Sequence, residues 1–151
     1  MSTFSQQRQI LVRTAGKGDW KKILALYASL DEEDLEYRFF NIHHVYSDEA
    51  KEMANPAEHL TLLALDGENA VGEATLQGNG EVSVVVSKGW RGQGIATKLV
   101  NELIQAAREK GFTRLKFFSL PSNSHMVSLG RAFGFRVVEH SNVDEEWVLD
   151  I

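Results

Sequence analysis

The spacing of hydrophobic residues changes along the chain, and the change predicts the order of its elements. A short strand is expected at residues 10–13. Apolar residues then recur every three or four positions up to residue 30, which predicts a helix capped by Asp19. Two further helices are predicted, at residues 31–40, where an acidic start suits a helix N-terminus, and at residues 47–54, before Pro56.

From residue 60 onward, short apolar runs alternate with turns. Strands joined by hairpins are expected at residues 60–65, 70–77 and 81–86, and the last is apolar enough to be predicted as a central strand. A long helix is predicted at residues 92–110, because its apolar residues lie four apart on one face and Gly111 suits its C-terminus. The remaining elements are expected as strand, helix, strand and strand at residues 114–119, 123–133, 135–140 and 145–150.

This order of helices, hairpins and strand–helix–strand units is typical of an α/β (α+β) fold. In such a fold, helices flank a mixed, mostly antiparallel central sheet. The 151 residues contain no repeat, long linker or shift in composition that would mark a boundary. We therefore expect residues 1–151 to form a single domain, which is long enough to bury a full core.

The composition excludes several classes of protein. With 43% hydrophobic and 25% charged residues, the chain has the composition of a globular protein. The absence of cysteine excludes disulfides, cysteine metal sites and a thiol nucleophile, and it fits a cytoplasmic protein. The N-terminus lacks the features of a signal peptide, and no apolar run approaches the ~20 residues that cross a bilayer, so no membrane partner is expected.

The charge of the chain bears on its partners. A net charge of −5 argues against direct binding of nucleic acid, which depends on Lys and Arg to neutralise phosphates. It favours a basic partner, such as a lysine-bearing protein or an amine. His43 and His44 are adjacent, so their side chains would point apart, and no metal site is predicted.

The most informative segment is a glycine-rich turn between the third hairpin strand and the long helix. The first amides of a helix have no acceptor within it, and the helix dipole makes that end positive, so a diphosphate suits it. Gly92 and Gly94 allow close approach of the backbone, Ala96 is small, and Arg91 adds a positive charge. The segment is neither a Walker A loop nor GxGxxG. A tight strand-to-helix turn without a ligand is the alternative interpretation.

The turn resembles the coenzyme A signature of the GCN5-related N-acetyltransferase superfamily, Gln/Arg-x-x-Gly-x-Gly/Ala after a hydrophobic strand. A second block supports the resemblance: Asn123 is followed by Leu129 and then by Gly134 and Phe135, as in the later motif of that superfamily. The resemblance implies acetyl-CoA as cosubstrate and a sheet that splays at the cofactor strand. It also implies a set of cofactor-binding residues: Val84, Val85, Val86, Arg91, Gly92, Gln93, Gly94, Ile95, Ala96, Thr97 and Asn123.

Acetyl transfer to an amine requires the neutral amine. A free lysine has a pKa near 10.4, so losing its proton at pH 7 costs roughly 4.6 kcal/mol, and a carboxylate can accept that proton. Glu81 is the candidate base, because it begins the predicted cofactor strand and resembles the glutamate that serves this role in histone-type and Pat-type enzymes. Glu73 on the neighbouring strand is the second candidate. A solvated acid beside a turn is the alternative interpretation of Glu81.

One position departs from the family. Many relatives carry a tyrosine seven residues after the asparagine, as a general acid, and this chain has Gly130 there. Together with Arg38, Phe39 and Phe40, this departure resembles the Pat-type protein lysine acetyltransferases, which implies a protein lysine as acceptor. A small-molecule amine acetyltransferase and a non-catalytic sensor of acyl-CoA are the alternatives.

Overall fold

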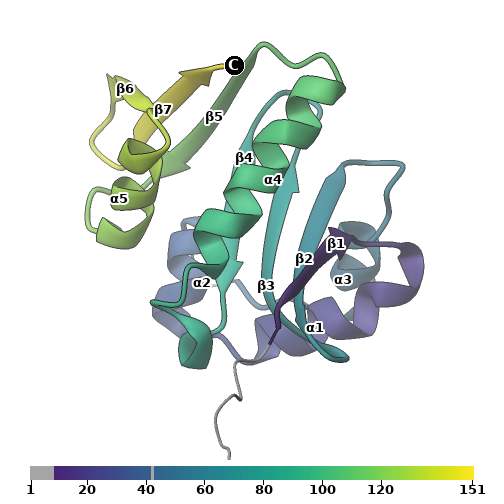
Figure 1. Ribbon diagram of the computed structural model, residues 1–151. Coiled ribbons are helices and arrows are strands. Elements are labelled where there is room, and N and C mark those ends of the chain that lie inside the picture. Colours follow the sequence, from purple (N-terminus) through teal and green to yellow (C-terminus); the bar gives the residue numbers. More distant parts are fainter. Residues whose placement is uncertain (1–8, 42) are drawn as a thin grey trace, which may run out of the picture.

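The computed structural model describes residues 9–41 and 43–151, and it contains two β-sheets that separate along the middle of the molecule (Figure 1). The expectation about a signal peptide concerns the start of the chain and lies largely outside the described residues. Within those residues, no helix combines the length and the apolar character needed to span a bilayer.

The first sheet is an antiparallel meander in the order β1-β2-β3-β4. Alternate residues of β2 belong to different hydrophobic clusters, because successive side chains of a strand point to opposite faces. Both faces of this sheet are therefore apolar and need a helical cover. The four strands are β1 (Leu11–Thr14), β2 (Leu60–Asp66), β3 (Asn69–Leu76) and β4 (Val82–Val86).

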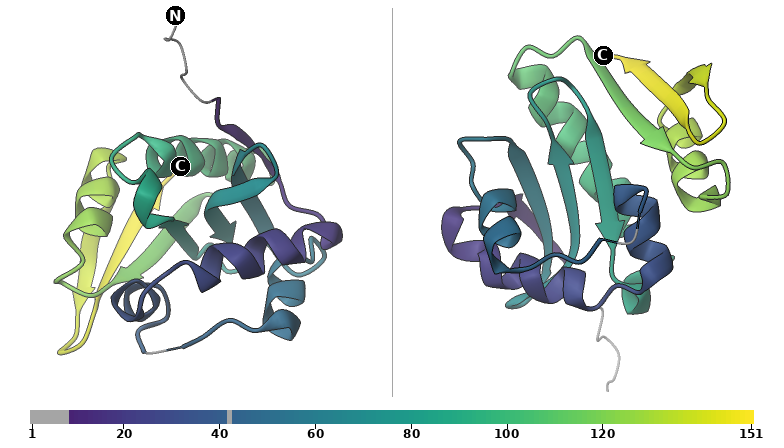
Figure 2. Two further views of the ribbon diagram at one scale, coloured as in Figure 1. Left: turned by 90° about the horizontal axis from the view of Figure 1, so that it is seen from below. Right: turned by 180° about the vertical axis from the view of Figure 1, so that it is seen from behind.

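Helices cover both faces of this sheet. Helix α4 (Ile95–Glu109) lies across one face and buries the apolar stripe that its sequence predicts (Figure 1). The other face carries α1 (Trp20–Ala28), α2 (Glu32–Phe39) and α3 (Ser47–Met53), as the view from behind shows (Figure 2). Helix α4 begins later than predicted, because the glycines of the preceding turn adopt left-handed backbone conformations.

The side chain of Asp19 does not cap α1, although this residue occupies the N-cap position. Instead, Asp19 Oδ2 accepts a hydrogen bond from the Gly16 amide at 2.8 Å. Its two carboxylate oxygens also accept hydrogen bonds from Arg13, at 2.7 and 2.8 Å. Asp19 is therefore the N-cap residue of α1, as predicted, but its side chain ties the short 3₁₀ turn Lys17–Asp19 to β1 and makes no capping hydrogen bond.

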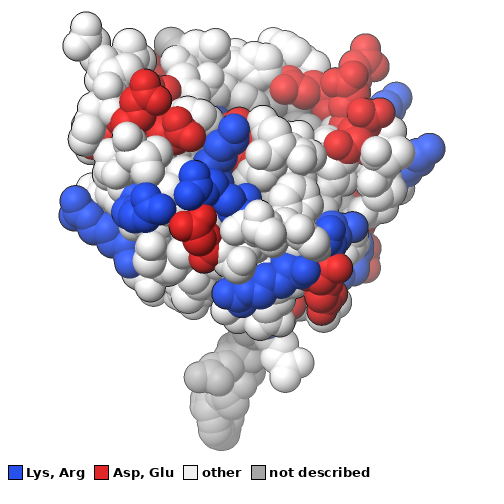
Figure 3. All heavy atoms as spheres, turned by 90° about the horizontal axis from the view of Figure 1, so that it is seen from above, with Lys and Arg blue, Asp and Glu red and all other residues white. Residues whose placement is uncertain are grey.

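The second sheet has the order β5-β7-β6 and is also antiparallel. It consists of β5 (Arg114–Ser119), β6 (Arg136–His140) and β7 (Glu145–Asp150), and α5 (Ser124–Ala132) connects β5 to β6. At one end, Asp150 accepts hydrogen bonds from Arg114 at 2.8 Å and from Arg136 at 3.2 Å. The face seen from above carries both basic and acidic side chains (Figure 3).

Within residues 9–41 and 43–151, one backbone bridge joins the two sheets, and it pairs Glu81 with Lys116 in parallel orientation. There the Lys116 amide donates to the Gly80 carbonyl at 3.0 Å. Beyond this bridge β4 and β5 diverge, so β4 is the last strand of its sheet and not the predicted central strand. Val82 is buried, and Val84, Val85 and Val86 are half-buried because α4 and α2 cover the two faces of the strand. The predicted α/β fold, mostly antiparallel and splayed beside β4, is confirmed.

Candidate functional site

The open edge of β4 presents alternate backbone groups to the gap between the sheets. At the two ends of the β3–β4 ladder, the Gln77 amide donates to the Glu81 carbonyl and the Ser87 amide donates to the Val71 carbonyl, each at 2.8 Å. Because hydrogen-bonded residues alternate along an antiparallel strand, the odd-numbered residues of β4 are the ones that bond to β3. The N–H and C=O groups of Val84 and Val86 therefore point toward β5. Of the three valines expected to contact a pantetheine chain, these two have backbone groups in the gap, whereas those of Val85 pair with β3.

The turn into α4 has the backbone geometry of an anion site. Gly92 and Gly94 have φ values of 76° and 80°, in the left-handed region that favours glycine, and Gly94 is the N-cap of α4. The amide of Lys98 donates to the Gly94 carbonyl at 3.0 Å, so the amides before it lie at the unpaired start of the helix. A Cβ built at either glycine meets no atom within 4 Å, so open space adjoins the backbone. These features fit a diphosphate group.

A cavity of about 500 Å³ joins this turn to the gap between the sheets. Its size lies within the range typical of small-molecule sites. The walls come from α2, β4, the turn into α4 with the first residues of α4, Phe118 of β5, and the length of α5. Of the predicted site residues, only Gln93 is absent from the described lining. The others line the cavity: Glu81, Val84, Val85, Val86, Arg91, Gly92, Gly94, Ile95, Ala96, Thr97 and Asn123.

Two ion pairs attach α2 to the segment before α4. The Arg91 guanidinium donates to Asp34 Oδ1 at 2.7 Å and to the Val86 carbonyl at 3.1 Å. Lys88 pairs with Asp31, and its ammonium holds the pKa of that carboxyl at about 2. The positive charge of Arg91 therefore lies at the wall of the cavity, on the side where α2 begins.

Glu81 lies where the two sheets part. Its amide donates to Asn79 Oδ1 at 3.0 Å, its carbonyl accepts from the Gln77 amide at 2.8 Å, and β4 begins one residue later than predicted. Alternation along β4 directs Glu81 and Val85 to the same face of the sheet, which is the face covered by α2. Among the described residues, no side chain forms an ion pair or hydrogen bond with the Glu81 carboxylate. Glu81 does interact with the charge of Arg38, whose pKa it helps to raise, but no hydrogen bond from a described side chain keeps a group in the cavity from reaching the carboxylate.

A buried polar network lies behind this part of the wall, and the sequence did not predict it. The Tyr27 hydroxyl is 3.2 Å from both carboxylate oxygens of Glu73 and accepts a hydrogen bond from Arg38 Nε at 3.1 Å. Burial raises the pKa of Glu73 and also that of Tyr27. Burial alone would lower the pKa of Arg38, but the neighbouring Tyr27 and Glu73 hold it above its ordinary value.

Within this network, Arg38 and Glu73 differ in their access to the cavity. Arg38 lines the cavity, whereas Glu73 has no exposed surface and is not part of the lining. Glu73, the second candidate for a base, therefore serves as a buried partner of Tyr27 and of Thr75, whose hydroxyl lies 3.3 Å from it. A charged residue within a buried strand was the one signal of this role in the sequence.

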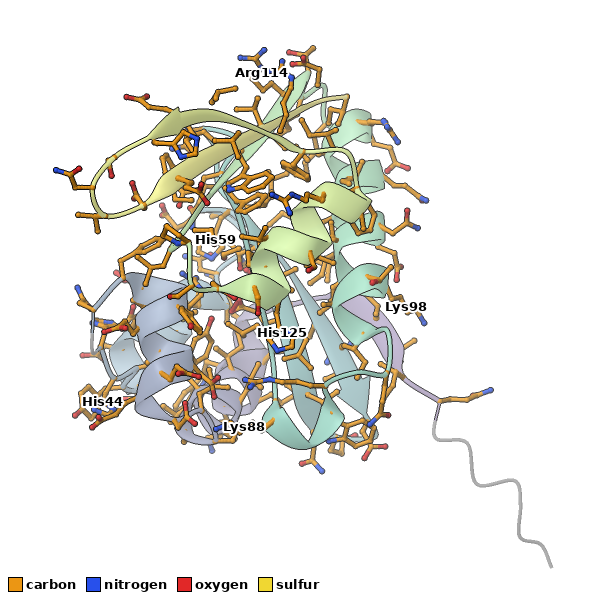
Figure 4. The ribbon with its side chains drawn as sticks, turned by 90° about the vertical axis from the view of Figure 1, so that its left-hand side faces the viewer. His44, His59, Lys88, Lys98, Arg114 and His125 are labelled. Carbon is orange, nitrogen blue, oxygen red and sulfur yellow. The ribbon has the colours of Figure 1, made fainter. Side chains whose placement is uncertain are left out.

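Helix α5 supplies the opposite wall. Asn123 Oδ1 accepts a hydrogen bond from the Met126 amide at 3.2 Å, so this side chain caps α5 while it lines the cavity. His125 also lines the cavity, and Figure 4 shows it between α5 and the segment that leads into α4. The Tyr37 hydroxyl donates to the Ser122 carbonyl at 3.1 Å, which links α2 to the loop before α5.

Gly130 has a structural explanation. A Cβ at this position would lie 2.5 Å and 2.8 Å from two ring carbons of Phe117. That ring is buried between Phe135, at a centroid distance of 5.1 Å, and Trp147, at 5.6 Å. The glycine therefore lets α5 approach β5 closely, and the ring of Phe117 occupies the space into which a side chain at residue 130 would project.

Comparison with known families and structures agrees with this geometry. The sequence matches the acetyltransferase (GNAT) family over residues 22–135, which is most of the chain. That segment includes α4, its preceding turn, the open edge of β4 and the helix that Asn123 caps.

Several solved structures share the fold. The GNAT domain of PAT from S. lividans has a TM-score of 0.84 at 20% identity, over 93% of this chain and 89% of that one. A GCN5-related N-acetyltransferase from Kribbella flavida has a TM-score of 0.79 at 22% identity, over 97% of this chain and 100% of that one. The protein yncA from Salmonella typhimurium, in a structure with its cofactor acetyl-CoA, has a TM-score of 0.76 at 20% identity, with 93% of each chain covered.

Proposed function

Because the chain belongs to the acetyltransferase (GNAT) family, we propose that it acetylates a lysine side-chain amine of a protein, with Glu81 as the general base. Acetyl-CoA is the cosubstrate. In the part of the chain that the structure describes, no group of three or more His, Cys, Asp or Glu side chains is placed to hold a metal ion.

The observation that carries the proposal is the position of Glu81. This carboxylate lies at the point where the sheets part, and it lines the same cavity as the turn into α4. A general base must lie within hydrogen-bond reach of the proton that it removes, directly or through one water. An amine that enters from the side of α2 would meet Glu81 before it reached the open edge of β4.

Different segments of the chain would bind different parts of acetyl-CoA. The amides at the start of α4 would hold the diphosphate, the outward groups of Val84 and Val86 would hold the pantetheine, and one of these strand amides would donate to the thioester oxygen. Asn123 and α5 would close the channel on its other side. In the transfer, the amine nitrogen bonds to the acetyl carbon, the carbon–sulfur bond breaks, and Glu81 takes the proton that the nitrogen loses.

The leaving group fits this site. The sulfur departs with its electron pair as a thiolate, which is a comparatively stable anion, so it can leave without a protein acid. Gly130 agrees with this route, since the described atoms nearest to a Cβ there belong to Phe117 and Phe135, whose side chains carry no proton donor.

Two features favour a protein as the acceptor. Glu33 lines the cavity, and Glu32 and Glu36 are exposed on the same short helix, so the approach on the α2 side is acidic and suits a basic segment. Arg38, Phe39 and Phe40 resemble the corresponding residues of Pat-type protein lysine acetyltransferases, and α2 brings two of them to the cavity wall. A small amine would not require this surface.

The test of the base is a pH–rate profile of Glu81→Gln on a lysine-containing protein. The variant keeps the shape of the side chain, and near neutral pH it should be slower by ~10²–10⁴, with acetyl-CoA affinity unchanged. The deficit should shrink toward the lysine pKa near 10.4, where the amine loses its proton unaided. Glu68→Gln, at an exposed carboxylate beside Lys22, is the matched control and should behave as wild type. A wild-type profile for Glu81→Gln would mean that the base lies elsewhere.

The acceptor class has its own measurement. Cell lysate is incubated with isotopically labelled acetyl-CoA and the protein, and the label is located by mass spectrometry. Label on lysine side chains supports the proposal. Label confined to small amines would replace it with the small-molecule alternative, and no label above background would favour a non-catalytic sensor.

A further inference from the structure

Phe40 has a backbone conformation that its side chain disfavours. It follows the last residue of α2 with φ 65° and ψ 12°, in the left-handed region, and its amide donates to the Glu36 carbonyl at 2.6 Å. Glycine is the usual residue at such a helix end, and a residue with a Cβ costs about 1–2 kcal/mol there. Each of the other described residues with a positive φ is a glycine. The chain therefore keeps phenylalanine where local physics favours glycine.

Core packing does not explain this phenylalanine. Phe40 is 36% exposed and belongs to neither hydrophobic cluster of the described residues. Its neighbour Phe39 takes the packing role, with ring centroids 5.8 Å from Tyr27 and 4.6 Å from His43. A strained backbone that persists without a packing reason is a common feature of functional sites.

The position of Phe40 supplies a reason. It lines the cavity together with Arg38 from the same helix and with Glu81. Because α2 covers the face of the sheet to which Glu81 is directed, Phe40 lies on the α2 side of the cavity. The diphosphate site lies at the start of α4, the helix that covers the opposite face of the sheet (Figures 1 and 2).

We infer that Phe40 is a specificity-determining residue for the acceptor, and that its ring packs against the methylene stem of the lysine whose amine reaches Glu81. This inference rests on the proposed function. A lysine side chain joins an apolar stem to a cationic head, and an aromatic ring contacts the stem and attracts the head with its face. The backbone strain at Phe40 is retained because a glycine would leave the stem without a contact.

Phe40→Gly tests this inference with two measurements, the thermal midpoint and the KM for a lysine peptide. If Phe40 had only a structural role, the variant would worsen both. The variant relieves the left-handed strain, so its thermal midpoint should equal or exceed that of wild type. Its KM for a peptide with a single lysine should rise about tenfold, the scale of one lost ring contact, with the KM for acetyl-CoA unchanged. Phe40→Asn, which also tolerates this conformation, should behave alike, and Phe40→Tyr should keep the wild-type KM.

The outcomes separate the inference from the proposed function. Transfer by wild type, with an unchanged peptide KM in Phe40→Gly or Phe40→Asn, would overturn the inference alone. A lowered thermal midpoint with both KM values raised would assign Phe40 a structural role and would also overturn it. If wild type acetylates no lysine peptide, the proposed function fails and the inference fails with it.

Discussion

Replacing Gly130 by alanine should destabilise the fold, against the ordinary preference of a helix. In a helix interior alanine is favoured over glycine by roughly 1 kcal/mol. Here the added methyl would lie 2.5 Å and 2.8 Å from the ring of Phe117, and Phe135 and Trp147 hold that ring on its other sides. Overpacking of a core costs about 1–3 kcal/mol, and a ring that cannot move places this site in the upper part of that range.

The net loss should therefore be about 1–2 kcal/mol, which lowers the midpoint of thermal unfolding by roughly 2–8 °C for a chain of this size. Urea and thermal unfolding of Gly130→Ala measure it. Below the transition, the acetyl-transfer rate should stay near the wild-type rate, since Gly130 does no chemistry in the proposed mechanism. A rate lower by orders of magnitude, in a folded variant that still binds acetyl-CoA, would show that the departure of the thiolate depends on this position.

Phe117→Leu provides the matched background. Leucine lacks the two ring carbons that a Cβ at residue 130 would meet, so the clash disappears while the helix preference for alanine remains. In this background Gly130→Ala should stabilise the protein by roughly 0.5–1 kcal/mol, and the double-mutant cycle should show favourable coupling. The same destabilisation in both backgrounds would refute the explanation by close packing.

Two further predictions concern the cofactor turn and the N-terminal strand. Gly94→Trp should abolish measurable acetyl-CoA binding in calorimetry. The control Gly67→Trp should bind acetyl-CoA normally, because Gly67 also has a positive φ and open space at its Cβ but lies outside the cavity lining. Equal affinities of the two variants for acetyl-CoA would refute the assignment of the turn. The Arg13 guanidinium holds the pKa of Asp19 at about 2, so the stability due to this pair is present above pH ~4 and is lost as the pH falls toward 2. Asp19→Asn should lower the free energy of unfolding by roughly 2 kcal/mol at pH 7 and flatten that acid dependence, and an unchanged acid slope would contradict it.

Much of the architecture could be predicted because local signals and burial agree. The four-residue spacing of apolar side chains defined α4, and glycines marked the ends of the hairpins. The position of β4 in its sheet could not be predicted from its apolar sequence. An edge strand that helices cover and a central strand that two other strands flank can have the same apolar sequence. The start of α4 was misplaced since sequence does not reveal the left-handed backbone of Gly94.

The site was predictable to different degrees. The turn and Asn123 belong to motifs with fixed spacing, and the structure brings them to one cavity. The hydrogen bonds among Tyr27, Arg38 and Glu73 join α1, α2 and β3 on one face of the sheet, and no spacing in the sequence encodes them. Arg91 was expected to serve a phosphate, and its ion pair with Asp34 was invisible because the two residues lie far apart along the chain.

The open edge of β4 also bears on self-association. Val84, Val85 and Val86 form an uncharged run of high β-propensity, and a bare edge of this kind is a template for pairing with another chain. Most proteins protect such edges with charges, prolines or bulges at the periphery of a sheet. Here the edge faces inward between two sheets, with α2 on one side and the Tyr37–Ser122 hydrogen bond across the gap. Apart from the Val86 carbonyl, which accepts from Arg91, the chain can therefore keep the outward backbone groups of Val84 and Val86 for a ligand, while a strand from a neighbouring molecule has no straight approach to them.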